Sequence, residues 1–409
     1  MNQSIKHSPN ESSETLTVTL PRSKSLSHRH LLLSHLHSNS AQIENLSISR
    51  DTRILQNALT ADTPVIDFQD AGTPSRFALV YFAVTHQTKT LTGNASLKKR
   101  SIADLVHTLQ QQGAVIEYLE NPGFFPLTLH QGITQSYPIW EIHTQESSQF
   151  ISALMLGITA LKPIPKLLVN GLLHSWSYIH LSADVLRKWG FTVDISNSEI
   201  TIEGSPITAM HLDIEIDWGS ASFVYLLAIF TKNKFRIIGA NRNSLQADYR
   251  TVSIFEQLGV NTKFIDNDAI IEYIPSEEVP AEFNGSECID LIPALASAYA
   301  YLQKDITFYG IEKLAVKESN RLERIAFHLG QLGISWEESN GGYHLSGHKL
   351  HIPEDFLIQT HHDHRIAMAF APWTSVISNV HIDDSACTEK SFPGYWELLK
   401  MCNFELLPS

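Results

Sequence analysis

The sequence predicts an α/β chain in which six repeats form two similar halves. Two interleaved series of helices are the basis of this prediction. In one series a helix ends at a glycine that leads straight into a strand, and in the other a strongly apolar helix follows small or polar residues. Both series recur at nearly regular spacing along the 409 residues, which is typical of a repeat architecture.

The helices of the first series end at Gly113, Gly190, Gly259 and Gly333. A glycine just past a helix adopts the left-handed cap conformation at low cost, so these positions mark helix ends. We therefore expect helices over 103–112, 184–189, 252–258 and 321–332. The stretches that follow are strand-like, over 114–118, 191–195, 260–265 and 334–337.

The helices of the second series should be buried, because they are apolar on nearly all faces. The clearest examples lie over 154–161, 224–229 and 295–301. Polar stretches begin the six helices of this series, at 23–29, 70–77, 146–150, 217–223, 290–293 and 361–365. The glycine-ended helices carry more charge and should lie outside the buried ones.

The repeats divide into an N-terminal half over 21–215 and a C-terminal half over 216–409. Residues 1–20 are assigned to the C-terminal half, because the strand-like stretch 15–20 precedes the first repeat and can pair there. The first repeat is short, and we infer that it has lost a hairpin between Thr60 and Gln69. The polar helix starts of the two halves should face each other across a cleft, which is a common place for a ligand site.

Composition excludes several classes of protein. The longest apolar runs, such as 223–230, fall well short of the ~18 residues that a membrane span needs. The polar N-terminus lacks a signal-peptide core, and three scattered cysteines form neither a disulfide framework nor a zinc pattern. We therefore expect a reduced, cytoplasmic compartment. The formal net charge of −13 argues against nucleic-acid and membrane partners, yet converging Lys and Arg can still bind small anions.

The first polar stretch is rich in groups that bind anions. Ser23, Lys24, Ser25, Ser27 and Arg29 precede an apolar run. The free backbone N–H groups of a helix start attract anions, and nearby cations strengthen that attraction. The same pattern is also typical of an ordinary capped core helix. These residues alone leave both interpretations open.

Three further clusters have structural interpretations of their own. The run 317–321 places Lys317 and Arg321 on one helix face, and a salt-bridged helix start is the commoner meaning of such a pattern. Asp290 could be a plain N-cap. The run 361–364 contains three histidines, but adjacent histidines point to different faces and no second ligand cluster is present, so we expect no metal.

Taken together, the motifs resemble one family, the 3-phosphoshikimate 1-carboxyvinyltransferases, also called 5-enolpyruvylshikimate-3-phosphate synthases. The resemblance covers the chain from Leu16 to Leu399 and rests on seven motifs in order. They read P-x-S-K-S-x-S-x-R, A-G-T-x-x-R, S-S-Q-F, S-x-S-Y-I, V-K-E-S-x-R-L, D-H-R-x-A-M and C-T-x-K-S-F-P. The resemblance implies a two-domain inside-out α/β barrel (the enolpyruvyl transferase fold), small anionic substrates, and neither a metal nor an organic cofactor.

The family transfers the enolpyruvyl group of phosphoenolpyruvate to the 5-hydroxyl of shikimate 3-phosphate, and phosphate leaves after a tetrahedral intermediate. By resemblance, shikimate 3-phosphate binds to residues of the first half, joined by Asp290 and Lys317 of the second. Lys24 reaches both substrates, Ser25 and Arg29 hold the shikimate carboxylate, Ser147, Ser148 and Ser175 hold the phosphate, and Gln149 and Tyr178 flank the ring.

Phosphoenolpyruvate is expected to bind to residues of both halves. By resemblance, Arg100 and Lys390 clamp its phosphate together with the loop of Gly72 and Thr73, and Arg321 and Arg365 hold its carboxylate. Lys24 and Gln149 are also expected to bind it. The resemblance makes Asp290 the acceptor of the hydroxyl proton and Glu318 the donor to C3, with Lys24, Lys317 and His364 close to the reaction. An acid and a base in separate environments are what such a step needs.

The chain departs from the family pattern at several positions. Arg22 replaces a usual Gly, His28 a usual Asn, Phe77 a frequent Pro and Asn320 a usual Asp. Asp70 replaces the Asn of N-A-G-T, which puts a carboxylate beside a phosphate site and should weaken anion binding unless it is paired. Arg22 is one candidate partner. The departures leave sensitivity to glyphosate, the family's known inhibitor, open.

Two other functions remain alternatives at this point. The sister enzyme that transfers enolpyruvyl to UDP-N-acetylglucosamine usually has Lys-Asn where this chain has Lys24-Ser25. A non-catalytic anion-binding relative is the other, although Asp290, Lys317 and Glu318 are all present. We expect a monomer.

Overall fold

The computed structural model describes residues 3–8, 14–38, 41–135, 137–145, 147–171, 176–207 and 209–407. The chain forms two compact units. The N-terminal unit is Ser23–Ile214, and the C-terminal unit combines Met1–Arg22 with Glu215–Ser409. Within the described part of the chain, no helix is both long and apolar enough to cross a membrane.

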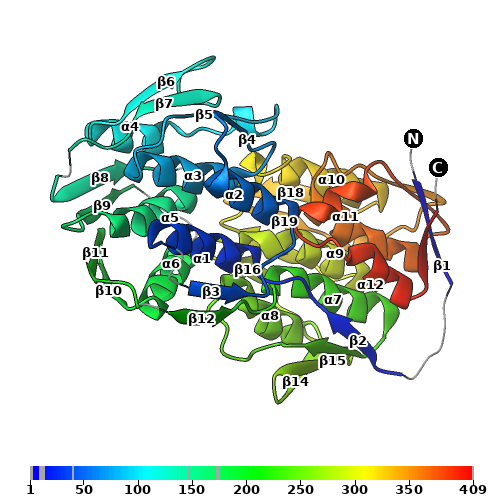
Figure 1. The fold of residues 1–409 in the computed structure, drawn as a ribbon. Coiled ribbons are helices and arrows are strands. Elements are labelled where there is room, and N and C mark those ends of the chain that lie inside the picture. The colour runs from blue at the N-terminus through cyan, green and yellow to red at the C-terminus, as the bar shows by residue number, and fades with distance from the viewer. Residues whose placement is uncertain are drawn as a thin grey trace. The chain divides into compact units, whose positions relative to one another are not determined.

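Three buried helices form the core of the N-terminal unit (Figure 1). They are α1 (Lys24–Leu36), α3 (Gly72–Val84) and α5 (Ser148–Gly157), and they pack against one another. Twelve of the thirteen residues of α3 are buried, because its sequence is apolar on every face. Three further helices, α2 (Arg50–Thr60), α4 (Ala103–Gln111) and α6 (Trp176–Lys188), carry more polar residues.

Three sheets complete the N-terminal unit. Two are four-stranded, in the orders β4-β5-β7-β6 and β8-β9-β11-β10, and the third pairs β12 with β3. The strands are β3 (Ala41–Glu44), β4 (Val65–Asp67), β5 (Lys89–Thr92), β6 (Val115–Tyr118), β7 (Leu127–Gln131), β8 (Ile139–His143), β9 (Lys166–Asn170), β10 (Phe191–Ser196), β11 (Glu199–Gly204) and β12 (Met210–Asp213).

The C-terminal unit repeats this plan with its own buried helices. They are α7 (Trp218–Thr231), α9 (Ile292–Leu302) and α11 (His364–Phe370), which contact one another. The more polar helices are α8 (Thr251–Gln257), α10 (Arg321–Gln331) and α12 (Tyr395–Met401). Short 3₁₀ turns carry several polar side chains, at η3 (Ala247–Arg250), η4 (Ile289–Leu291), η5 (Glu312–Val316) and η8 (Ser385–Lys390).

Three four-stranded sheets belong to the C-terminal unit, in the orders β2-β13-β15-β14, β16-β17-β19-β18 and β20-β21-β1-β22. The strands are β1 (Gln3–His7), β2 (Leu16–Thr19), β13 (Phe235–Ile238), β14 (Val260–Ile265), β15 (Asp268–Tyr273), β16 (Glu282–Asn284), β17 (Ile306–Tyr309), β18 (Trp336–Ser339), β19 (Gly342–Leu345), β20 (Asp355–Ile358), β21 (Asn379–Ile382) and β22 (Phe404–Leu407).

All five four-stranded sheets share one pairing pattern, in which a parallel pair is followed by two antiparallel pairings. The two-stranded sheet contains only the parallel pair, β12 with β3. In the repeat that holds this sheet, α2 leads directly into β4 without the antiparallel hairpin of the other repeats. The sheets therefore repeat as the sequence predicts.

The glycine-ended helices occur where the sequence predicts them. Gly113, Gly190, Gly259 and Gly333 all have positive φ, between 71° and 94°, which is the left-handed cap conformation. β2 pairs in parallel with β13 of the C-terminal unit, as expected for residues 15–20. The sequence reasoning did not identify β1, which pairs with β21 and β22 from the far end of the chain.

Candidate active site

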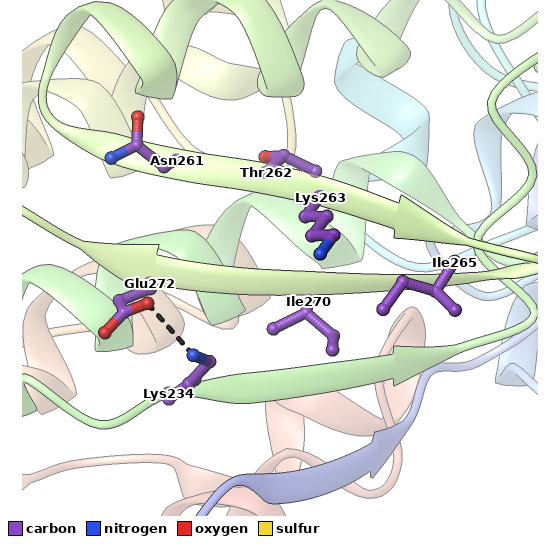
Figure 2. A pocket seen from close by; sticks show the side chains of 7 residues that line it. All are labelled: Lys234, Asn261, Thr262, Lys263, Ile265, Ile270 and Glu272. Atoms are coloured by element: carbon purple, nitrogen blue, oxygen red, sulfur yellow. Dashed lines mark hydrogen bonds and ion pairs between the residues drawn. The ribbon is translucent and has the colours of Figure 1, made fainter.

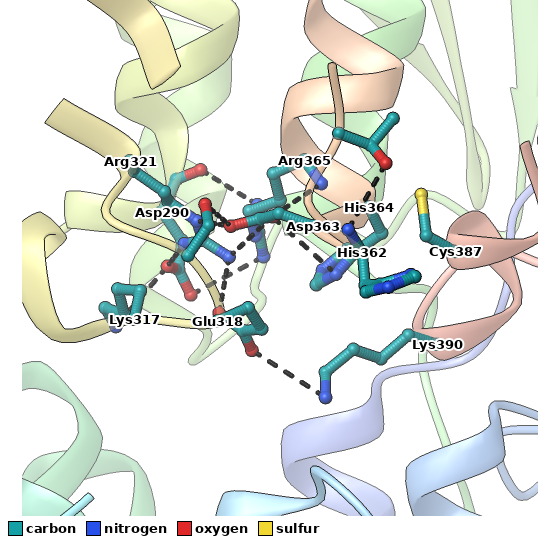
Figure 3. Close-up of polar contacts among 12 residues, drawn as sticks. Asp290, Lys317, Glu318, Arg321, His362, Asp363, His364, Arg365, Cys387 and Lys390 are labelled. Atoms are coloured by element: carbon teal, nitrogen blue, oxygen red, sulfur yellow. Dashed lines mark hydrogen bonds and ion pairs between the residues drawn. The ribbon is translucent and has the colours of Figure 1, made fainter. Parts of the chain in front are cut away.

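Arg321 lies at the centre of a buried charged cluster in the C-terminal unit (Figure 3). It is the first residue of α10, which begins there because the Asn320 side chain caps the helix by accepting from the Glu323 backbone N–H. Its Nε donates to Asp363 Oδ2 over 2.8 Å, and its Nη2 donates to Asp363 Oδ1 over 3.2 Å. The side chain is only 1% exposed.

Two further carboxylates share the same guanidinium. Nη1 of Arg321 donates to Asp290 Oδ1 over 2.8 Å, and Nη2 donates to Glu318 Oε2 over 2.7 Å. Burial alone would lower the pKa of Arg321, but the charges of Asp363, Glu318 and Asp290 outweigh burial and raise it. The bidentate contact with a substrate carboxylate stays a prediction, and it would require a carboxylate of the protein to yield its place.

Asp290 lies in η4, immediately before α9, and several cations face it. Arg365 Nη1 donates to its backbone carbonyl over 2.9 Å, and Arg365 Nη2 lies 3.5 Å from its Oδ2. Lys317 Nζ lies 3.5 Å from its Oδ1. Burial opposes ionisation, but Arg365, Lys317 and Arg321 together hold the pKa of Asp290 well below its usual range. Asp290 is therefore ionised at neutral pH.

The remaining predicted residues of the second half join the same cluster. Lys390, at the end of η8, places its Nζ 4.0 Å from Glu318 Oε1, and its side chain is 1% exposed. His364 begins α11 and is almost completely buried. Asp363 caps α11 by accepting from the Arg365 backbone N–H over 3.0 Å. Figure 3 shows Asp290, Glu318, Arg321, Asp363 and Arg365 grouped together, with Lys390 directed toward Glu318.

Asp248 is a further member that sequence reasoning missed. It lies in η3 and is 9% exposed, and its Oδ1 has no hydrogen-bond partner among the described residues. Its Oδ2 lies 3.2 Å, and Arg365 Nη2 3.1 Å, from the point that a β-carbon would occupy at Gly219. Burial raises the pKa of Asp248 to about 7, although the nearby Arg365 lowers it. The only sequence signal was the glycine within the polar stretch 217–223.

The N-terminal unit holds a second group of predicted residues around α1. Ser23 caps this helix by accepting from the Leu26 backbone N–H. Lys24 Nζ forms an ion pair with Asp51 Oδ2 at 3.1 Å, and Asp51 belongs to the first turn of α2. The next residue, Ser25, is partly exposed. The first polar stretch is thus a capped helix start that also presents a cation.

Arg29 is buried beneath this helix start. Its Nε donates to Ser182 Oγ over 2.9 Å, and its Nη2 donates to Ser152 Oγ and to the carbonyl of Tyr178. Its Nη1 donates to the carbonyl of Ser25 over 2.9 Å. Burial lowers the pKa of Arg29 to about 10. These contacts leave one N–H of Nη1, so a bidentate contact with a substrate carboxylate would have to displace one partner, and the predicted role of Arg29 stays a prediction.

Gly72 and Arg100 come together at the start of α3. A β-carbon at Gly72 would lie 2.8 Å from Arg76 Nη1, 3.1 Å from Arg100 Nη1 and 3.7 Å from Gln149 Oε1. Arg100 Nε is buried with no hydrogen-bond partner among the described residues. Thr73 is the next residue of the helix. Two guanidinium groups beside a helix N-terminus are suited to an anion.

Arg76 is a second residue that the sequence reasoning did not assign, although its motif was recognised. The structure also gives Asp70 a partner, because Arg50 Nη2 lies 2.8 Å from Asp70 Oδ1. Arg22, the partner suggested from sequence, belongs to the C-terminal unit and forms a β-bridge with Ile216. Asp70 is therefore paired with Arg50, and a contact between Arg22 and Asp70 stays a prediction.

The predicted phosphate-binding serines lie at the start of α5. Ser147 caps the helix by accepting from the Gln149 backbone N–H over 3.2 Å, and Ser148 is 8% exposed. Tyr178 lies in the first turn of α6 and is partly exposed. Ser175 lies outside the described residues.

The departures His28 and Phe77 are core residues. His28 Nε2 lies 3.2 Å from Thr52 Oγ1, and burial lowers the pKa of His28 to about 3, so the ring is neutral. Phe77 is fully buried in α3, with the guanidinium carbon of Arg29 5.8 Å from its ring centre. Both residues support helix packing in the N-terminal unit.

Outside these charged clusters, neither metal-ligating groups nor pockets among the described residues point to a second site. No group of three or more His, Cys, Asp or Glu side chains among them could hold a metal ion. A shallow pocket lies on the sheet of β13, β14 and β15, where Lys234 Nζ pairs with Glu272 at 3.0 Å (Figure 2). Lys263 and Ile270 also line it, and none of the predicted site residues does.

The chain matches a family model described as EPSP synthase (3-phosphoshikimate 1-carboxyvinyltransferase) over residues 55–399. A 3-phosphoshikimate 1-carboxyvinyltransferase of Bacteroides fragilis is 31% identical over 398 residues, with 95% of each chain covered. An EPSP synthase structure from Acinetobacter baumannii has a TM-score of 0.74 at 20% identity, covering 99% of this chain and 100% of that one. An enolpyruvyl transferase structure from Streptomyces tendae has a TM-score of 0.73 at 13% identity, covering 100% and 99%.

Proposed function

Because the chain belongs to the EPSP synthase family, we infer that it is a 3-phosphoshikimate 1-carboxyvinyltransferase of the shikimate pathway. Such an enzyme transfers the enolpyruvyl group of phosphoenolpyruvate to the 5-hydroxyl of shikimate 3-phosphate and releases phosphate. The observation that carries this inference is the family match across residues 55–399. The fold supports it, since both structural relatives are enolpyruvyl transferases with the same overall arrangement of the chain.

The charge of the substrates explains why cationic side chains are needed. The two substrates bring two phosphates and two carboxylates, and burying them without partners would be very costly. Lys24, Arg76 and Arg100 in the N-terminal unit, and Arg365 and Lys390 in the C-terminal unit, could supply the compensating charge. The proposal requires residues of both units to act on one pair of substrates.

Shikimate 3-phosphate is proposed to bind mainly to the N-terminal unit. Lys24, Ser25 and Arg29 would hold its carboxylate side, and Ser147 and Ser148 its phosphate, together with Ser175. Gln149 and Tyr178 would flank the ring. The start of α5 favours this assignment, because a helix N-terminus with hydroxyl side chains suits a phosphate.

Phosphoenolpyruvate is proposed to bind with its phosphate at the start of α3. Gly72 leaves the space there, since a β-carbon would meet both Arg76 and Arg100. Lys390 would approach the same phosphate, and Arg321 and Arg365 would hold the carboxylate. Arg365 is the better placed of the two arginines to exchange partners, because its contact with the Asp290 carboxylate spans 3.5 Å.

The proton transfers are assigned to two carboxyl groups of the C-terminal cluster. The 5-hydroxyl loses its proton to Asp290 as its oxygen attacks C2, and C3 gains a proton from Glu318, which must first take up that proton because its carboxylate is paired with Arg321 in the free protein. The tetrahedral intermediate then expels phosphate and loses a proton from C3. The low pKa of Asp290 keeps it ionised, and transfer of Arg321 and Arg365 to the substrate carboxylate would raise its basicity. Lys24, Lys317 and His364 would stabilise the developing charges.

The direct test is a steady-state assay of phosphate release from phosphoenolpyruvate. We expect release with shikimate 3-phosphate and none with UDP-N-acetylglucosamine, which is the substrate of the sister enzyme. Release with only the second acceptor would reassign the function, and release with neither would contradict it. Mass spectrometry of the product should show the enolpyruvyl ether of the accepted substrate.

Two broader features are also proposed. We propose that the protein works in the cytoplasm, where phosphoenolpyruvate is available and its three buried cysteines stay reduced. We further propose that it acts as a monomer, since each predicted ligand of the two substrates belongs to a single chain. Sedimentation at working concentration would test the second point.

A further inference from the structure

Asp70 brings a buried negative charge to the start of α3, where the phosphate of phosphoenolpyruvate is proposed to bind. It directly precedes Ala71, the N-cap of α3, and is 6% exposed. The N-terminus of a helix and two guanidinium groups would otherwise make this place strongly favourable for an anion. An unpaired carboxylate here would act as a competitor for the groups proposed to bind the phosphate of phosphoenolpyruvate.

Arg50 meets this carboxylate from another helix. It is the first residue of α2, and its Nη2 lies 2.8 Å from Asp70 Oδ1. The Asp70 side chain is 9% exposed and that of Arg50 is 38% exposed. Arg50 Nε is buried without a hydrogen-bond partner among the described residues. The pair is therefore desolvated on the side of Asp70, where charge cancellation matters most.

A second ion pair lies beside the pair of Arg50 and Asp70. Asp51 follows Arg50 in the first turn of α2 and pairs with Lys24 at 3.1 Å. The start of α2 thus presents a positive and a negative side chain in succession, and each meets its opposite from a different element. Lys24 pairs with Asp51, and Arg50 pairs with Asp70.

We propose that Arg50 is a positioning residue for the phosphate subsite, which cancels the charge of Asp70 and so keeps Arg76 and Arg100 available to the substrate. Arg50 acts through Asp70 and does not itself touch the substrate. This inference rests on the proposed function, because it assumes that the start of α3 receives the phosphate of phosphoenolpyruvate. If it is right, the effect of replacing Arg50 on phosphoenolpyruvate binding depends on whether Asp70 is present.

The test is a double-mutant cycle in the full-length protein. Titration calorimetry would measure phosphoenolpyruvate binding to Arg50→Gln, Asp70→Asn and the double variant. We expect Arg50→Gln to raise the Kd about tenfold, because the buried Asp70 carboxylate loses the cation that lies 2.8 Å from it beside the site. Asp70→Asn should bind at least as tightly as the unaltered protein. The double variant should recover most of the lost affinity.

Steady-state kinetics provide the second readout. Arg50→Gln should raise KM for phosphoenolpyruvate and leave KM for shikimate 3-phosphate nearly unchanged. Arg53→Gln is the matched control, because Arg53 lies on the same helix, is exposed, and its side chain makes no hydrogen bond or ion pair among the described residues. It should bind and turn over both substrates normally.

Each contrary result has a distinct meaning. If the double variant binds as weakly as Arg50→Gln, the loss is structural or Arg50 touches the substrate, and the proposal is wrong. The proposal also fails if Asp70→Asn weakens binding as much as Arg50→Gln. If the unaltered protein binds phosphoenolpyruvate but releases no phosphate, the proposed function fails while the cycle still decides the role of Arg50. Absence of any binding would overturn both.

Discussion

Arg321 and Asp363 form a doubly hydrogen-bonded ion pair whose two side chains are 1% and 0% exposed. Neither charge can rely on water, so each depends on its partner for compensation. Asp290 and Glu318 complete the ring of carboxylates around the same guanidinium. The loss of Arg321 would leave three negative charges close together in a poorly hydrated place. The loss of one carboxylate would still leave Arg321 paired with the other two.

Arg321→Gln should therefore destabilise the protein by about 3–5 kcal/mol, the usual cost of breaking a buried ion pair. Chemical denaturation would measure the free energy of unfolding. Arg324→Gln is the comparison on the same helix. Arg324 makes its side-chain contacts at the surface, with Glu323 at 3.3 Å and with His361 Nε2 at 2.7 Å, so its loss should cost less than about 1 kcal/mol. Equal losses in the two variants would show that the central network contributes little to stability.

Glu318→Gln should lower kcat by at least about 10²-fold while both substrates still bind, because the amide cannot donate the proton that C3 requires. The amide can still accept the hydrogen bond from Arg321 Nη2, which now spans 2.7 Å. Rapid-quench measurement of a single turnover would separate chemistry from product release. Near-normal turnover would reject Glu318 as the proton donor.

Gly72→Ala should raise KM for phosphoenolpyruvate by about tenfold or more, because the added methyl would press on the two guanidinium groups of the subsite. KM for shikimate 3-phosphate should change little. Gly330→Ala is the matched control, since a β-carbon at that helical position would meet nothing within 4 Å. An unchanged KM in Gly72→Ala would mean that the phosphate does not approach the start of α3.

Local signals in the sequence predicted much of the fold. Gly113 and Gly259 end their helices because a left-handed cap is a property of the residue itself. The predicted residues of the second half share one cluster, because the polar stretches before α9 and α11 also begin buried helices that pack together. In both cases the decisive information lies within a few neighbouring residues.

Pairing between residues that are distant in sequence leaves no local signal, so the sequence does not predict it. β1 has a polar sequence and becomes a strand only because β21 and β22 provide partners on both sides. Arg50 meets Asp70 through the packing of α2 beside α3, and no local pattern marks the pair. The number of carboxylates around Arg321 likewise depends on residues that are distant in sequence. Such contacts follow from packing and have no signature in composition or periodicity.

Asp248 provides a prediction for the pH dependence of stability. Its pKa is raised to about 7 by burial, with Asp290 and Asp217 adding to the effect and Arg365 and Lys317 opposing it. The folded protein therefore holds this proton more tightly than the unfolded chain does. The stabilisation from the bound proton is complete below the unfolded pKa near 3.8 and is lost as the pH rises through about 7.

Asp248→Asn removes this titration while it keeps the size of the side chain. The free energy of unfolding of the variant minus that of the unaltered protein should rise by about 2 kcal/mol as the pH is raised from about 5.5 to about 8.5. Urea denaturation at both pH values would measure the gain, and other titrating groups cancel in the comparison. Asp62→Asn, an exposed carboxyl in the N-terminal unit, is the control and should show no such change. A difference between Asp248→Asn and the unaltered protein that stays constant across this range would show that Arg365 keeps Asp248 ionised throughout.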